Sequence, residues 1–213
     1  MPKRVLVVLA GCGHLDGSEI HEAVITLLAL ARRGCAVQCA APDKPQHHVI
    51  DHLRREPTGE TRNVLVEAAR IARGNIAALG TVNAADYDGV FLPGGFGAAK
   101  NLSDVAFAGA AAHADPELER VLRAFRAANK PIGGVCIAPA ILVAALREGE
   151  VTIGAEPGPI EGLGGTHVAC PVTEMHVDRA RKIVTAPAYM YDATIADVAT
   201  GIERAVAAFA ELL

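Results

Sequence analysis

Short apolar runs alternate with longer amphipathic segments along this chain. The runs that have the length and β-branched content of buried strands are residues 4–10, 35–41, 89–92 and 132–135. Apolar residues at helical spacing predict helices over residues 18–33, 60–73, 116–129 and 195–213, and a hairpin is predicted over residues 175–185. Strands that alternate with helices predict an α/β fold, a doubly wound and mostly parallel sheet with helices on both faces.

No repeat, low-complexity tract or linker divides the chain, so we expect residues 1–213 to form a single domain. Ser18 is a good N-cap for the first predicted helix, and Asp115 for the third. The apolar positions of the first helix are Ile20, Val24, Leu27, Leu28 and Ala31. Residues 42–60 are polar and rich in proline, and we expect a long excursion there.

Composition narrows the range of partners and compartments. The 213 residues are half apolar and carry a formal charge of −4, which argues against nucleic acid as a partner. No apolar stretch reaches about 18 residues, so no membrane span is expected. Five scattered cysteines without a secretory signal suggest reduced thiols, and we expect a cytoplasmic protein.

Ligands of doubly wound folds bind outside the carboxyl ends of the strands. Three of the predicted strands end in unusual sequences, namely Gly11 to Glu22, the turn Pro93 to Asn101, and Cys136. The glycines of the second sequence let backbone amides come close to a ligand. We therefore expect these three sequences to converge on one crevice.

Cys136 lies between a short apolar run and Pro139, which is tolerated in the first turn of a helix. This order predicts a sharp strand-to-helix turn of the kind that exposes the nucleophile of serine hydrolases. A helix N-terminus stabilises anions, so we expect the Cys136 pKa to lie below the usual value of about 8.5 and its thiol to be the most reactive of the five. The alternative is a buried cysteine that acts as a small hydrophobic residue.

Glu19 and Glu22 lie three residues apart at the start of the first helix, so both side chains can point toward the crevice. They can also be solvated carboxylates that the helix dipole favours. A carboxyl group buried against Cys136 would have a raised pKa and would move protons.

Two other chemistries are weaker. Gly11 and Gly13 follow a strand as in dinucleotide-binding loops, but the third glycine is Gly17, one residue late, with Asp16 in its place; Asp43 would then bind a ribose. A metal site built from the loop histidines His47, His48 and His52 competes with the simpler interpretation of solvated side chains.

Several motifs together resemble the ThiJ/PfpI superfamily, which is related to class I glutamine amidotransferases and has a flavodoxin-like fold. They are Leu92-Pro93-Gly94-Gly95, Gly97-Ala98-Ala99-Lys100-Asn101-Leu102 and Gly134-Val135-Cys136-Ile137-Ala138-Pro139. Within it the chain is similar to bacterial glyoxalases linked to lycopene, or isoprenoid, biosynthesis. The segments that carry this closer likeness include Asp16 to Ala23, Thr61 to Leu65 and Pro187-Ala188-Tyr189-Met190.

The resemblance implies the roles of the site residues. Cys136 would be the nucleophile and a glutamate of the first helix its partner, with Glu22 favoured over Glu19. The backbone amides of Gly95 and Ile137 would stabilise an oxyanion, with Gly94 beside them in the substrate site.

The resemblance also implies a cofactor-independent glyoxalase, a lyase that converts glyoxal or a similar small aldehyde to glycolate without glutathione or metal. We further expect a homodimer. A redox-sensing module with a reactive cysteine and a deglycase of proteins or nucleotides remain alternatives. Protease-like members carry histidine after the cysteine, whereas this chain has Ile137. Peptide hydrolysis would need His14 or His21 to complete a pair, and the sequence does not place His167 or His176.

Overall fold

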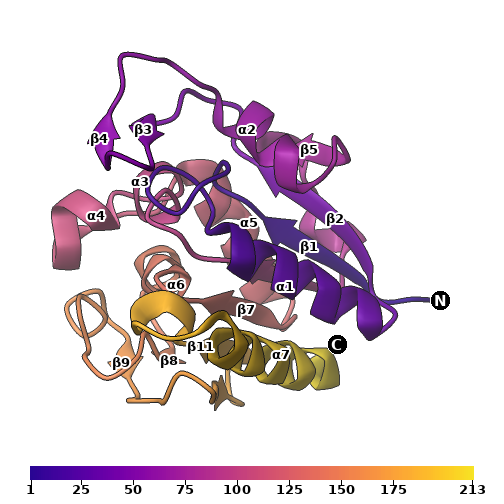
Figure 1. Cartoon of the computed structure of the whole chain (residues 1–213). Coiled ribbons are helices and arrows are strands. Elements are labelled where there is room, and N and C mark those ends of the chain that lie inside the picture. Colours follow the sequence, from indigo (N-terminus) through magenta and orange to yellow (C-terminus); the bar gives the residue numbers. More distant parts are fainter.

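The computed structural model describes residues 1–213, and its centre is a seven-stranded sheet between two layers of helices (Figure 1). The strand order is β10-β11-β7-β6-β1-β2-β5, and all neighbours are parallel except β10 and β11. The strands are β1 (Arg4–Val8), β2 (Ala36–Ala41), β5 (Ile76–Ala78), β6 (Gly89–Leu92), β7 (Ile132–Val135), β10 (His176–Asp178) and β11 (Ile183–Ala186). This order confirms the predicted flavodoxin-like, doubly wound fold.

The helices include the four that the sequence predicts. They are α1 (Ile20–Arg32), α2 (Val64–Ile71), α3 (Ala98–Asn101), α4 (Val105–Ala108), α5 (Pro116–Ala127), α6 (Ala138–Leu146) and α7 (Ile195–Leu212). Helix α2 starts later than predicted because Asn63 is its N-cap and accepts a hydrogen bond from the Val66 amide. None of these helices combines the length and apolarity needed to cross a membrane.

Short elements connect the main ones. The polar excursion carries the antiparallel pair β3 (Ile50–Asp51) and β4 (Glu56–Pro57), and β8 (Glu150–Val151) pairs in parallel with β9 (Thr166–His167). The 3₁₀ turns are η1 (Leu79–Thr81), η2 (Ala84–Asp86), η3 (Gly109–Ala111) and η4 (Ala188–Met190). Strand β5 was not predicted, because three residues are too few to show a periodicity.

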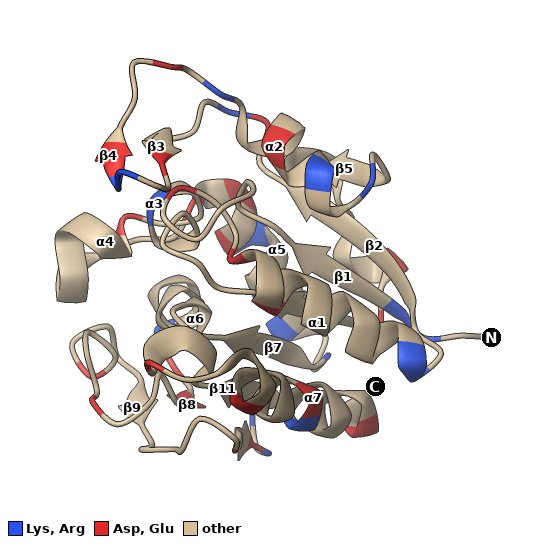
Figure 2. Ribbon diagram, viewed as in Figure 1, with Lys and Arg blue, Asp and Glu red and all other residues tan.

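Alternating side chains of β1 feed two separate apolar cores. Val5, Val7 and Leu9 pack with α1, α2 and α7 on one face of the sheet, while Leu6 and Val8 pack with α5 and α6 on the other. Every residue of α6 is buried, and charged side chains of both signs are spread over the outer helices and loops (Figure 2). The two faces explain why β1 reads as a continuous apolar run.

Helix α1 differs from the prediction in its cap and its face. Its N-cap is Glu19, whose carboxylate accepts the Glu22 amide at 2.7 Å, whereas the Ser18 hydroxyl accepts the Ala10 amide at 2.8 Å. Three of the expected core positions, Ile20, Val24 and Leu28, are exposed. The buried face carries smaller or polar residues, namely Glu22, Ala23, Thr26 and Ala29, together with Leu30. Small side chains allow α1 to pack closely on α7 and the sheet.

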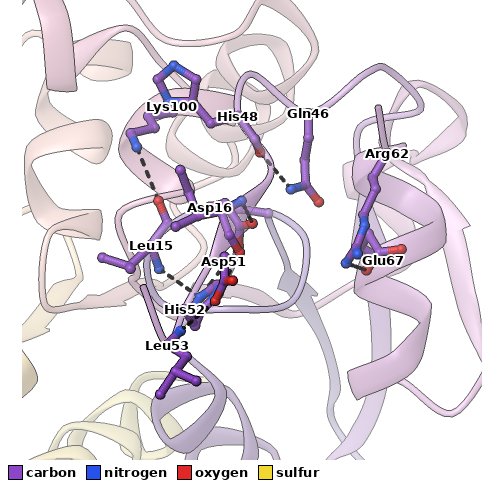
Figure 3. A network of polar contacts seen from close by, with 12 residues as sticks. Leu15, Asp16, Gln46, His48, Asp51, His52, Leu53, Arg62, Glu67 and Lys100 are labelled. Carbon is purple, nitrogen blue, oxygen red and sulfur yellow. Dashed lines mark hydrogen bonds and ion pairs between the residues drawn. The ribbon is translucent and has the colours of Figure 1, made fainter. Parts of the chain in front are cut away.

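The loop of residues 11–18 is tied to the polar excursion by hydrogen bonds (Figure 3). The carboxylate of Asp16 accepts the Ile50 amide at 2.7 Å, and the Leu15 amide donates to His52 Nε2 at 3.3 Å. Lys100 of α3 donates to the Leu15 carbonyl at 3.1 Å. These bonds fix the loop between two elements that lie far from it in the sequence.

Asn101 is the buried centre of the same region. Its Nδ2 donates to the carbonyls of Ala10 and Asp16 at 2.9 and 3.0 Å, and its Oδ1 accepts the His47 amide at 3.0 Å. One side chain therefore joins the end of β1, the loop and the excursion.

Asn101→Ala should lower the free energy of unfolding by about 3 kcal/mol, because three buried backbone groups lose their partner. Urea denaturation followed by circular dichroism measures this. Asn75→Ala is the matched control, since Asn75 is exposed and should change stability by less than about 0.5 kcal/mol. An Asn101→Ala protein as stable as the control would contradict the role of Asn101.

Candidate active site

The three unusual sequences meet at the carboxyl edge of the sheet, as predicted. The Gly94 amide donates to Glu22 Oε2 at 2.9 Å, which joins the turn after β6 to α1. The Phe96 amide donates to the His14 carbonyl at 2.7 Å. Cys136 reaches the same place, since a Cβ added to Gly94 would lie 2.5 Å from Cys136 Cβ. One crevice thus receives residues from β1, β6 and β7.

Cys136 occupies the predicted sharp turn between β7 and α6. Its φ is +61°, a left-handed conformation that residues other than glycine rarely adopt, and its amide donates to the Ala186 carbonyl at 3.0 Å. Pro139 lies in the first turn of α6, as its fixed φ favours. The strained turn holds the sulfur over the N-terminus of α6.

Glu22 is fully buried beside this cysteine. Its Oε2 accepts the Gly94 amide and its Oε1 the Tyr189 amide at 3.3 Å, and the carboxyl group is hydrogen-bonded to Cys136. Burial raises the pKa of Glu22 to about 7, and the nearby charge of Glu19 adds to the rise. The structure therefore brings Glu22 to the sulfur, while Glu19 caps the helix.

The pKa of Cys136 departs from the prediction made from sequence. Burial raises the pKa of this thiol well above its usual value, and the negative charge of Glu22 raises it further. Hydrogen bonds from the amides of Gly95 and Ile137 act in the opposite direction but are weaker. The prediction of a lowered pKa is wrong, because only 7% of Cys136 is exposed and loss of solvent outweighs the helix dipole.

Two glycines are required by this geometry. At Gly94 a Cβ would lie 2.5 Å from Cys136 Cβ and 2.9 Å from Glu22 Oε2, so any side chain would separate the pair. Gly95 has φ of +106°, and a Cβ there would lie 2.4 Å from the Glu19 amide nitrogen. The amides of Gly95 and Ile137 both point at the sulfur, where an oxyanion would form.

The histidines lie apart from the cysteine. His21 Nδ1 is hydrogen-bonded to the hydroxyl of Tyr189 at 2.9 Å, and the His14 ring contacts the ring of His52. His176 on β10 lies 3.5 Å from Glu150. His167 belongs to β9. The partners of Cys136 are a carboxyl group and two amides.

Tyr189 is the site residue that the sequence did not single out. It follows β11, and its amide completes the hydrogen bonding of Glu22. The only available signal was the segment Pro187 to Met190, which supported the family resemblance without suggesting a role.

The alternative chemistries find little support in the geometry. The Gly13 amide donates to the Ser18 carbonyl at 2.9 Å and the Gly17 amide to the Gly13 carbonyl, so amides that a phosphate would need already have partners. Asp43 accepts a hydrogen bond from Asn63 at 2.8 Å. No group of three or more His, Cys, Asp or Glu side chains has the geometry of a metal site.

Comparison with protein families identifies the architecture. The model of the DJ-1/PfpI family matches residues 3–186, which include every residue of the crevice except those after β11. The chain belongs to the DJ-1/PfpI family. This confirms the resemblance seen in the sequence.

Curated members of the DJ-1/PfpI family are close to this chain over nearly its whole length. The human "Glutamine amidotransferase-like class 1 domain-containing protein 3, mitochondrial" is 47% identical over 98% of this chain and 83% of its own length. The zebrafish "ES1 protein, mitochondrial" is 33% identical over 88% of this chain and 77% of its own length. These names overturn the predicted cytoplasmic location, which rested on reduced thiols and on a missing secretory signal. Such a signal reports only on secretion, because mitochondrial address segments are of another kind.

Solved structures of the DJ-1/PfpI family show the same fold. An isoprenoid biosynthesis protein with an amidotransferase-like domain from Ehrlichia chaffeensis is 41% identical, with a TM-score of 0.93, and covers 99% of this chain and 100% of its own. Glyoxalase III from Candida albicans is 15% identical, with a TM-score of 0.62, and covers 97% of both chains. The second likeness shows a shared fold.

The raised pKa of Glu22 gives a test of its burial. An acid with a folded pKa of about 7 and an unfolded pKa of 4.5 contributes stability below pH 4.5 that is lost as pH rises through 7. Glu22→Gln does not titrate, so its stability relative to the wild type should rise by about 3 kcal/mol between pH 4 and pH 8. Urea denaturation at both pH values measures this.

Glu161→Gln is the control, because Glu161 is exposed and its difference from the wild type should not depend on pH. A Glu22→Gln difference as flat as that of the control would show that Glu22 is not desolvated.

Proposed function

We propose that the protein is a glyoxalase that acts on glyoxal or a similar small 2-oxoaldehyde through Cys136, without glutathione. The observation that carries the proposal is the buried contact of Glu22 with Cys136 beneath the amides of Gly95 and Ile137. A nucleophile, a base and two oxyanion donors lie within one crevice, as carbonyl addition requires.

The first step forms the bond between sulfur and carbon. Because the Cys136 thiol has a raised pKa, it stays protonated, and the Glu22 carboxylate takes its proton as the sulfur adds to one aldehyde carbon. The carbonyl electrons move to oxygen, and the oxyanion accepts the amides of Gly95 and Ile137. A pKa of about 7 lets Glu22 act as a base and later as an acid near neutral pH.

The second step moves a proton between the two carbons. Glu22 removes the C–H proton of the hemithioacetal to give an enediol and returns a proton to the neighbouring carbon, which leaves a thioester of Cys136. Water hydrolyses the thioester, breaks the S–C bond and restores the thiol. The sum is glyoxal plus water giving glycolate and a proton, with no external oxidant.

The family relationships support carbonyl chemistry at a coarse level. The fold is shared with glyoxalase III of Candida albicans, but the relatives of higher identity are named for their amidotransferase-like domain. Amide hydrolysis is less well supported, since Ile137 follows the cysteine and His21 binds Tyr189 instead. A redox sensor is also less well supported, because oxidation favours exposed thiols of low pKa.

Turnover of glyoxal by glutathione-free protein, followed as glycolate formation, tests the proposal. Cys136→Ser should abolish turnover. Glu22→Gln should lower it by about 100-fold or more, because it cannot transfer protons. Glu19→Gln should keep most of the activity, since the side-chain oxygen of the introduced glutamine can still accept the Glu22 amide.

Two results would overturn the proposal. One is glycolate formation that survives in Cys136→Ser. The other is casein cleavage that disappears in both Cys136→Ser and His21→Ala, which would favour a cysteine–histidine hydrolase.

Turnover should also depend on pH with a defined sign. Glu22 must be ionised to take the thiol proton, so kcat/KM should rise with pH with a midpoint at about 7, the pKa of Glu22. Removal of the neighbouring charge in Glu19→Gln should move this midpoint to lower pH, since that charge raises the Glu22 pKa. A profile that falls through pH 7, or an unmoved midpoint in the variant, would contradict the role of Glu22 as base.

A further inference from the structure

The turn that follows β11 is strained at its centre. Ala188 is fully buried with φ of +45°, and Cys136 with φ of +61° is the only other buried non-glycine residue in the left-handed region. The two residues follow the neighbouring parallel strands β11 and β7. Backbone strain of about 1–3 kcal/mol persists where surrounding contacts enforce it, and it gathers at functional sites.

The strained turn directs both ends of Tyr189 toward α1. The Tyr189 amide donates to Glu22 Oε1 at 3.3 Å, while its hydroxyl is hydrogen-bonded to His21 Nδ1 at 2.9 Å. His21 and Glu22 are consecutive residues of α1, so Tyr189 bridges from the turn to the helix across the Glu22 carboxyl group. The Tyr189 side chain also packs against the apolar core cluster that contains Cys136.

We propose that Tyr189 and His21 form a clasp over the Glu22–Cys136 pair and that this clasp limits the size of the aldehyde that reaches the sulfur. The substrate part of this inference rests on the glyoxalase function proposed above. Tyr189 and His21 act as specificity-determining residues, and neither takes part in the proton transfers.

Three features make the clasp a suitable barrier. Only 7% of Cys136 is exposed, so access to the sulfur depends on the side chains above it. The bond between Tyr189 and His21 joins two elements 168 residues apart, and the exposed rim around it allows the bond to open and close. Burial and the charges of Glu19 and Glu22 raise the pKa of the Tyr189 phenol, so the hydroxyl keeps its proton at neutral pH.

Access to Cys136 can be measured without any turnover. The probes are iodoacetamide, which is small, and fluorescein maleimide, which is bulky, and peptide mass spectrometry gives the modification rate of Cys136 for each. In Tyr189→Phe and in His21→Ala the ratio of the bulky to the small rate should rise about fivefold, the effect of losing one ordinary hydrogen bond. The double variant should rise no further, because both changes remove the same bond.

Tyr191→Phe is the matched control. Tyr191 lies two residues further along the chain, and its hydroxyl donates to the Cys170 carbonyl at 2.8 Å, away from Glu22. The ratio for Cys136 should stay at its wild-type value in this variant. A ratio unchanged in both Tyr189→Phe and His21→Ala, or raised equally in Tyr191→Phe, would overturn the clasp.

Selectivity between aldehydes gives a second measurement. The ratio of kcat/KM for phenylglyoxal to that for glyoxal should rise about fivefold in Tyr189→Phe and in His21→Ala, again the effect of one hydrogen bond. An unchanged ratio in a protein that turns over glyoxal would refute the effect on specificity. If the wild type converts neither aldehyde, the proposed function fails while the labelling ratio still decides whether the clasp exists.

Discussion

The structure of the site depends on one buried contact, that of the Glu22 carboxyl group with the Cys136 thiol. Two ionisable groups removed from water disfavour their charged forms, and burial raises the pKa of both. The contact persists because the amides of Gly94 and Tyr189 satisfy the carboxyl oxygens. The turns after β6, β7 and β11 must therefore all be held in place around one side chain of α1.

This contact changes how the cysteine is activated. A helix N-terminus and two amide hydrogen bonds favour a thiolate, but desolvation outweighs them in the crevice. A pair in which the carboxyl group titrates near neutral pH avoids that difficulty, since the thiol gives up its proton only as it attacks. The same burial restricts access, so chemistry and selection of small substrates have a common physical origin.

The scaffold shows how the DJ-1/PfpI fold supplies such a site. The central strands end at one edge of the sheet, and the strained residues Cys136 and Ala188 follow two adjacent ones. Behind them, Phe91 of β6 packs edge-to-face on Phe209 of α7 at 5.4 Å. Gly133 is required beside it, because a Cβ there would lie 2.2 Å from the Phe91 ring. Rigid packing below the edge allows irregular backbone above it.

The sequence by itself determined the features that depend on local periodicity and on rigid residues. The apolar runs fixed the central strands, Asp115 fixed the start of α5, and Pro139 after Cys136 fixed the sharp turn. The tertiary structure alone decided which carboxyl group meets the sulfur, because Glu19 and Glu22 are equivalent in spacing until the N-cap is known. It also decided the direction of the Cys136 pKa, the part played by Tyr189 and the buried face of α1. Each of these depends on solvent exclusion and on contacts between distant segments, which no local pattern records.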